Sequence, residues 1–219
     1  MLLLALDTAS PSVSVAVHDG AQVLAAHTAT EAARHAELLT PAIEQVLAEL
    51  FVTPRELTAI TVGAGPGPFT GLRVGLATAR VLGFALGIPV SGVCSLDAVA
   101  AGAVRMGLDA PEFLVATDAR RHEVYWARYS VSPPGLPMRQ GQPQVGAAAS
   151  IPADGLPVAG RGALLYPEIL GQPALPLDPD AGDLAALAVV GEPYRTQPQP
   201  LYLRRPDAQI PGARKRVRP

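Results

Sequence analysis

The chain has 219 residues, of which 49% are hydrophobic and 16% charged, and its formal net charge is −2. This composition excludes the disordered class of proteins, and the length allows one large domain or two lobes of about 100 residues each. The charge is uneven, because the segment 204–219 carries six basic residues against Asp207 while the rest of the chain is acidic. A basic tail of this kind indicates an anionic partner.

The sequence predicts a soluble cytoplasmic protein. No run approaches the roughly 18 uninterrupted apolar residues of a membrane span, and the opening MLLLALD lacks the basic region of a signal peptide. A single cysteine, Cys94, cannot form an internal disulfide, and no CxxC or Cys/His cluster indicates structural zinc. We therefore expect no membrane contact, no disulfide and no metal.

Hydrophobic periodicity and turn residues predict a regular first half. An Asp19-Gly20 turn between apolar runs is typical of an antiparallel meander, and Gly87 followed by Pro89 ends a long helix. In chain order we expect strands at 2–6, 12–17 and 21–28, a helix at 31–51, a short helix capped by Thr53, a strand at 59–62, a helix at 71–87, a strand at 88–93 and a helix from a Ser95 cap to about residue 107.

The second half is rich in proline and is expected to be less regular. We expect strands at 113–117 and 123–129, joined by a turn at 118–122. The stretch 133–157 is predicted to be a loop or irregular, and a short helix is predicted at 183–190.

The two halves share a pattern of strand, aspartate, short turn and second strand. Overlaying them at an offset of 111 residues matches Asp7 with Asp118 and Val13 with Val124. This repeat predicts a two-lobed α/β protein, and the element order fits the ribonuclease H-like lobe of the actin, sugar kinase and Hsp70 superfamily. We expect an N-terminal lobe at 1–107, a truncated, degenerate and loop-rich C-terminal lobe at 108–203, and a basic tail at 204–219.

In that superfamily the first turn of each lobe reads Asp-x-Gly, and the glycine lets the backbone approach nucleotide phosphates. The matching turns here are Asp7-Thr8-Ala9 and Asp118-Ala119-Arg120, so both glycines are replaced. We expect Asp7 and Asp118 to stabilise their turns through Asx hydrogen bonds rather than to catalyse a reaction.

The loop GAGPGPFTG at 63–71 lacks the lysine of a phosphate-binding loop, and its two prolines have no N–H to donate. A weak anion site remains open at Phe69, Thr70 and Gly71, where a helix begins. The alternative is a rigid turn from strand to helix.

No catalytic or metal-binding set is predicted. The histidines His18, His27, His35 and His122 do not have the spacing of a ligand pair, and no GxSxG motif is present. We expect Cys94, at the end of an apolar strand, to be a buried small residue.

Small residues recur every fourth position along the helix 71–87 and form one narrow stripe. Either the chain's own elements or a helix of another subunit packs closely against this stripe. We predict a two-fold interface between subunits, formed by Leu39, Ile43, Val46, Gly75, Ala79 and Gly83.

Five segments together resemble the TsaB family of bacterial threonylcarbamoyladenosine biosynthesis proteins, which are related to the glycoproteases. The segments are ALDTAS at 5–10, HAELLTP at 35–41, GPGPFTGLRVGL at 65–76, DARRHEVYWA at 118–127 and LYLRRPDA at 201–208. The resemblance implies a cytoplasmic protein needed to attach threonylcarbamoyl to the adenosine next to the tRNA anticodon. It also implies two partners, a TsaD-like catalytic paralogue and a TsaE-like ATPase.

The chain departs from the catalytic paralogue, which has a metal-binding His-x-x-x-His pair, because that pair is absent here. We therefore expect a non-catalytic protein that binds and activates the paralogue, forms a homodimer when alone and holds no cofactor itself, with ATP used by the complex. The basic tail is expected to add contacts to tRNA held mainly by the partner. An ATP-dependent small-molecule kinase and a metallopeptidase remain the alternatives.

Overall fold

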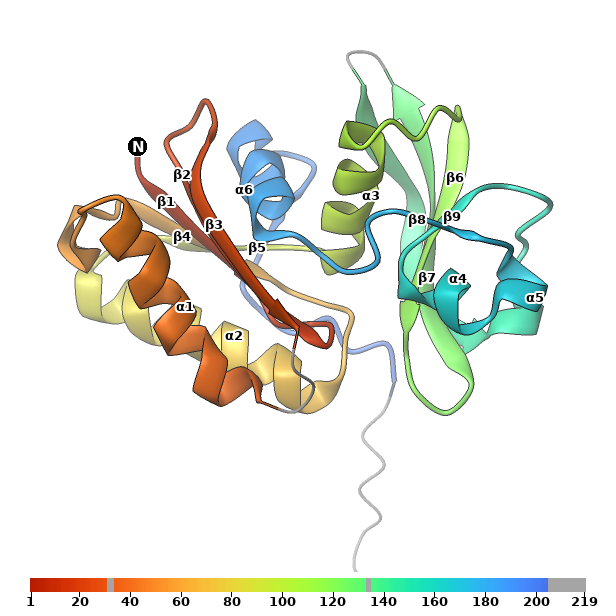
Figure 1. The fold of residues 1–219 in the computed structure, drawn as a ribbon, viewed down its shortest axis with the longest axis horizontal. Coiled ribbons are helices and arrows are strands. Elements are labelled where there is room, and N and C mark those ends of the chain that lie inside the picture. The colour runs from red at the N-terminus through yellow and green to blue at the C-terminus, as the bar shows by residue number, and fades with distance from the viewer. Residues whose placement is uncertain (31–33, 133–134, 205–219) are drawn as a thin grey trace, which may run out of the picture.

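The computed structural model describes residues 1–30, 34–132 and 135–204 (Figure 1). Two sheets, each with helices on both faces, form a mixed α/β architecture, which confirms the predicted fold class. The basic residues Arg205 and Arg214 to Arg218 lie outside the described residues, as does the predicted beginning of the first helix at 31–33.

The first sheet has six strands in the order β11-β5-β4-β1-β2-β3. The first three strands form the predicted antiparallel meander, and β1, β4 and β5 run parallel. The bounds are β1 (Leu3–Asp7), β2 (Ser12–His18), β3 (Val23–Thr30), β4 (Ala59–Gly63), β5 (Val90–Val93) and β11 (Arg195–Thr196).

Helices cover both faces of this sheet. Helices α1 (His35–Glu49) and α2 (Phe69–Leu86) lie on one face, and α6 (Ala181–Val190) lies on the other (Figure 1). Alternation along β1 explains this, because Leu4 and Leu6 pack toward α1 and α2 while Leu3 and Ala5 pack toward α6. The strands β1, β2 and β4 are therefore buried on both faces.

The second sheet has five strands in the order β10-β9-β6-β7-β8. Helix α3 packs on one face and the short helices α4 and α5 pack on the other. The bounds are α3 (Ser95–Arg105), β6 (Glu112–Asp118), β7 (Glu123–Ser132), β8 (Leu136–Ala147), β9 (Val158–Ala159), α4 (Arg161–Leu165), α5 (Pro167–Leu170) and β10 (Pro173–Ala174). Two 3-10 turns, η1 (Pro54–Glu56) and η2 (Ala148–Ser150), complete the described elements.

The prediction of an irregular stretch at 133–157 is wrong for residues 136–147, which form the long strand β8. The prolines at 137 and 143 suggested a loop because proline cannot donate to a strand ladder. Strand β8 lies at the edge of its sheet, where a missing N–H costs little.

The predicted repeat is present as two hairpins, β1–β2 and β6–β7, but the overlay is wrong beyond the turn. Asp7 pairs with Ser14 in the first hairpin, whereas Asp118 pairs with Val124 in the second. The second connection is therefore one residue shorter, so Val124 corresponds to Ser14 and not to Val13.

The chain returns to the first sheet after building the second. Helix α6 packs on β1 and β2, and β11 pairs with β5. The lobe boundary near residue 107 stays a prediction. That prediction placed residues 181–196 in the second lobe, whereas α6 and β11 pack with the first sheet.

Helix α2 is long and apolar enough by length and composition to cross a membrane. One such helix is weak support for a span, because helices packed on the sheet of a water-soluble domain meet the same criteria. Here α2 packs on β4 and carries Arg73 and Arg80 on its exposed face.

Candidate functional site

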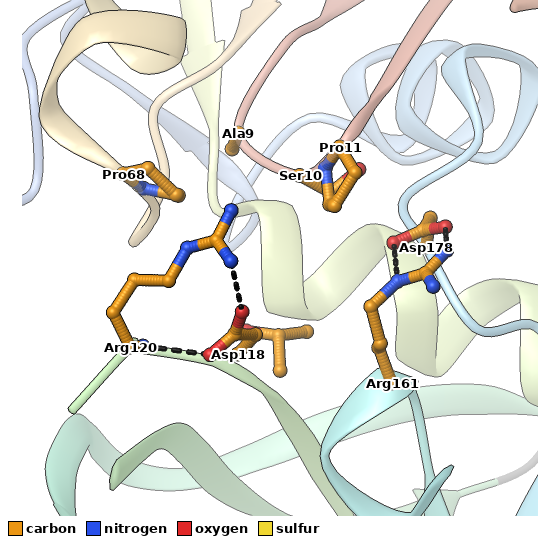
Figure 2. A pocket seen from close by; sticks show the side chains of 9 residues that line it. Ala9, Ser10, Pro11, Pro68, Asp118, Arg120, Arg161 and Asp178 are labelled. Atoms are coloured by element: carbon orange, nitrogen blue, oxygen red, sulfur yellow. Dashed lines mark hydrogen bonds and ion pairs between the residues drawn. The ribbon is translucent and has the colours of Figure 1, made fainter. Parts of the chain in front are cut away.

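A small cleft lies where the turn of the β1–β2 hairpin faces the turn of the β6–β7 hairpin (Figure 2). Its cavity measures about 10 Å³, which is close to the room that one water molecule needs. Both turns were predicted candidates, and the structure brings them together. The lining residues include Ser10, Pro68, Asp118, Arg120, Arg161 and Asp178.

Asp7 is buried at the base of the first turn and accepts two short hydrogen bonds. The Ala9 N–H donates to Oδ1 at 2.7 Å, which confirms the predicted Asx turn, and the Ser95 hydroxyl donates to Oδ2 at 2.6 Å. Burial raises the pKa of Asp7 to about 6, although both hydrogen bonds act in the opposite direction. Burial thus favours the protonated form of Asp7 over what an exposed aspartate would show.

The prediction that Ser95 caps α3 with its side chain is wrong. The N-cap residue is Cys94, and the Ser95 hydroxyl is used instead by Asp7 and by the Gly65 N–H, which donates to it at 3.2 Å. A hydroxyl that satisfies a buried carboxylate stabilises more than one at a helix end.

Asp118 confirms the predicted Asx turn in the second hairpin, since the Arg120 N–H donates to its Oδ1 at 2.7 Å. The Arg120 guanidinium also lies 3.2 Å from Asp118 Oδ2 and points into the cleft (Figure 2). Arg120, Arg121 and His122 all have left-handed backbone conformations, with φ of 61°, 57° and 62°. This turn therefore directs a guanidinium into the cleft.

The second wall of the cleft is an ion pair that the sequence analysis missed. Arg161, the first residue of α4, donates from Nε to Asp178 Oδ1 at 3.0 Å and makes a second contact to Oδ2. The Ser12 hydroxyl donates to the same carboxylate at 3.1 Å. Asp178 thus connects α4 beside the second sheet to β2 of the first.

The loop at 63–71 has glycine because the β1 turn of the same chain packs directly against it. A Cβ at Gly63 would lie 1.8 Å from Asp7 Oδ2, and a Cβ at Gly67 would lie 2.3 Å from the Ala9 carbonyl oxygen. These close approaches support the rigid-turn alternative for this loop. The anion site at Phe69, Thr70 and Gly71 stays a prediction.

Comparison with known proteins assigns the family. The family model of TsaD, tRNA N6-adenosine threonylcarbamoyltransferase, matches residues 22–136, just over half of the chain. The solved structure of YeaZ from Pseudomonas aeruginosa superposes with a TM-score of 0.77 at 33% identity, covering 92% of this chain and 99% of YeaZ. The chain belongs to the TsaD family as a TsaB-like protein.

Two further relatives are similar to the chain. The protein TsaB of Escherichia coli, named for tRNA threonylcarbamoyladenosine biosynthesis, is 36% identical over 137 residues, which cover 62% of this chain and 58% of TsaB. Protein Mb3455c of Mycobacterium bovis, which has no assigned function, is 45% identical over 213 residues, covering 94% of this chain and 93% of that protein.

The small-residue stripe of this TsaB-like chain packs within the subunit, which argues against the interface predicted on it. A Cβ at Gly75 would lie 2.5 Å from Thr8 Oγ1, and one at Gly83 would lie 2.2 Å from Val90 Cγ2. A residue covered by its own sheet cannot contact a second subunit. All six predicted contact residues are buried in the core of the chain: Leu39, Ile43, Val46, Gly75, Ala79 and Gly83.

The opposite face of α2 is the one left exposed. Phe84 is 92% exposed and Val81 66% exposed, and Ala77, one turn before Val81, is exposed as well. The same 3.6-residue periodicity defines both the stripe and this exposed face. The sequence therefore shows that α2 has two different faces, but not which of them faces the sheet.

Other side chains of the TsaB-like chain are engaged in structural roles. His35 Nε2 lies 2.7 Å from the Ser10 carbonyl oxygen. Cys94 is buried, as predicted, and burial raises the pKa of its thiol to about 12. Within the described residues, no group of three or more His, Cys, Asp and Glu side chains is placed to hold a metal ion.

Proposed function

We propose that this chain is a non-catalytic partner in the threonylcarbamoyladenosine modification of tRNA, and that it binds and activates a TsaD-like catalytic paralogue. The observation that carries the proposal is the cleft, where the chain's own ion pairs occupy the space between the two hairpin turns. Relatives named TsaB are biosynthesis proteins of this modification.

The cleft argues against the kinase alternative. A transferring phosphoryl group needs preorganised donors and room for in-line attack. Arg120 is held against Asp118, and Arg161 is held against Asp178. Both guanidinium groups are thus neutralised by carboxylates of the same chain, and a cavity of about 10 Å³ admits no nucleotide phosphate.

The surface for the paralogue is proposed on the outward faces of α1 and α2, in place of the buried stripe. Exposed Phe84 and Val81 supply apolar area on α2, next to exposed Arg80. Helix α1 exposes Glu44 and Glu49. An acidic helix beside a basic helix is self-complementary under a two-fold axis, so the same surface fits a second copy of this chain or a paralogue of the same fold.

The remaining partners follow from the family. A TsaE-like ATPase would use ATP within the complex, and the basic tail would contact tRNA held mainly by the paralogue. The protein would act in the cytoplasm and would form a homodimer when alone.

The test is a matched pair of charge substitutions. Phe84→Asp places a carboxylate in the proposed surface, whereas Ile169→Asp changes a residue that is 48% exposed on α5, beside the second sheet. We expect Phe84→Asp to abolish co-elution with the TsaD-like protein and activation of it, and Ile169→Asp to preserve both. If both variants bind and activate like the parent chain, the proposed surface is wrong.

A further inference from the structure

Residues 201–204 connect the first sheet to the β6–β7 turn, next to residues that line the cleft. Leu201 and Tyr202 contact the first sheet and its helix α2. The Leu201 N–H donates to the Ala64 carbonyl at 2.8 Å, and the Tyr202 ring stacks on Phe69 with centroids 5.5 Å apart. Arg73 Nε donates to the Tyr202 hydroxyl at 2.9 Å. Tyr202 is thus fixed on the first turns of α2, next to Pro68 of the cleft wall.

Arg204 contacts the β6–β7 turn, on the opposite side of the cleft. Its Nη1 donates to the Ala119 carbonyl at 2.7 Å, and its Nη2 donates to the Arg120 carbonyl at 3.4 Å. The same guanidinium forms an ion pair with Glu123. In Figure 1 the last described residues, in blue, run from the first sheet toward this β6–β7 hairpin.

The turn that Arg204 contacts has an uncommon backbone. Three successive residues, none of them glycine, are left-handed at 120–122. Such conformations persist only where surrounding contacts fix them. Arg204 supplies hydrogen bonds to two carbonyls at the start of this turn, so it helps to set where the Arg120 side chain lies.

We propose that residues 201–204 are a latch that ties the turn carrying Arg120 to the first sheet, and that their release opens the cleft by moving Arg120. Arg120 lines the 10 Å³ cavity and also a neighbouring cavity of about 320 Å³ beside the first residues of α1 and α2. Ser10, Pro11 and Pro68 line both cavities as well. Displacing Arg120 therefore joins the two spaces into one accessible cavity.

The movement is local, because other contacts between the sheets stay in place. Arg105 on α3, beside the second sheet, donates to Asp183 on α6 of the first, from Nε to Oδ1 at 2.6 Å and from Nη2 to Oδ2 at 2.9 Å. The contacts of Asp178 with Ser12 and Arg161 are also independent of the latch. Release thus detaches the turn at 119–123 from residues 201–204, and Arg120, which stays bonded to Asp118, moves with that turn while the rest of the fold stays in place.

The experiment measures access to the cleft with a thiol. Ser10→Cys places a sulfur among the residues shared by both cavities, where Ser10 is 7% exposed. The native Cys94 is the chain's single cysteine and is buried, so it reports global unfolding in the same molecule. The rate of modification of each thiol by a charged maleimide is followed by peptide mass spectrometry.

In this background, we expect the double change Tyr202→Ala and Arg204→Ala to speed modification of the introduced thiol at least tenfold while Cys94 stays unmodified. The matched control is Arg195→Ala, which removes another arginine–carbonyl hydrogen bond, to Ala188, away from the cleft. This control should leave the rate unchanged, and Arg204→Lys should recover part of the protection through the charge pair with Glu123.

An unchanged rate in the folded double variant overturns the latch. If Cys94 and the introduced thiol are modified at the same rate, the double variant unfolds. The milder variant Arg204→Gln then replaces it in the test of the latch. With Cys94 protected, Arg204→Gln must raise the rate of modification for the latch to stand, and an unchanged rate rejects it.

Discussion

The Ser95 hydroxyl donates a 2.6 Å hydrogen bond to Asp7 Oδ2 and so joins the first turn of α3 to the end of β1. Both groups are buried, and the Gly65 N–H donates to the same hydroxyl. The Asp7 carboxylate is thus engaged within the chain's own core.

Ser95→Ala should destabilise the chain by about 1–3 kcal/mol, because it leaves a buried carboxyl oxygen and a buried N–H without a partner. Urea unfolding followed by circular dichroism measures the change. The control is Ser150→Ala, which removes the 2.8 Å bond of an exposed serine to the Ala147 carbonyl and should cost less than about 0.5 kcal/mol. Equal losses in the two variants would contradict the role given to Ser95.

Asp7 should make stability depend on pH between about 4 and 6. Its pKa is raised from 3.8 to about 6 in the folded chain, so the folded state binds the extra proton and this group's contribution is present below pH 4 and lost as pH rises through 6. The full effect is on the order of 3 kcal/mol.

Asp7→Asn removes this titration and keeps an oxygen to accept from Ala9. We expect its advantage in unfolding free energy over the parent chain to be largest at pH 7 and to shrink as pH falls to 4.5. A difference between the two proteins that does not change with pH would show that burial of Asp7 has no such effect.

Ala79→Leu should destabilise the fold rather than separate subunits, because Ala79 is fully buried against the sheet. Overpacking of this kind costs about 1–3 kcal/mol. Ala77 lies two residues before Ala79, on the exposed face of α2, so Ala77→Leu should leave thermal stability unchanged. If Ala79→Leu keeps the parent's melting temperature, the stripe does not pack as the structure has it.

Truncation after Gly212 should weaken binding of tRNA to the assembled complex, since it removes Arg214, Lys215, Arg216 and Arg218. Each lost phosphate contact lowers the slope of log affinity against log salt by about 0.9 for a duplex. Filter binding between low and moderate salt measures the slope. Identical slopes for truncated and full-length complexes would leave the tail without this role.

The sequence predicted the elements that depend on local pattern. The meander, the Asp19-Gly20 turn and the C-terminal end of α2 at Gly87 follow from periodicity and turn chemistry, and all three are present. The Asx turns at Asp7 and Asp118 are equally local, because each side chain bonds a backbone N–H two residues ahead.

Contacts between distant segments could not be predicted from the sequence. A stripe of small residues on α2 predicts close packing, but whether Gly83 meets Val90 or another subunit depends on the tertiary fold. The Arg161–Asp178 pair, 17 residues apart across α5 and β10, has no local pattern. Strand β8 was missed because its prolines are tolerated only at a sheet edge, which the sequence does not mark.

The central claim is that the chain activates a catalytic paralogue and performs no chemistry in its own cleft. The direct test is tRNA threonylcarbamoylation by the TsaD-like and TsaE-like proteins with added parent chain, with Asp118→Asn, or with Phe84→Asp. We expect parent and Asp118→Asn to support equal rates, Phe84→Asp to support none, and the isolated chain to hydrolyse no ATP. Loss of modification with Asp118→Asn, or ATP turnover by the isolated chain on the order of 1 per second, would contradict the claim.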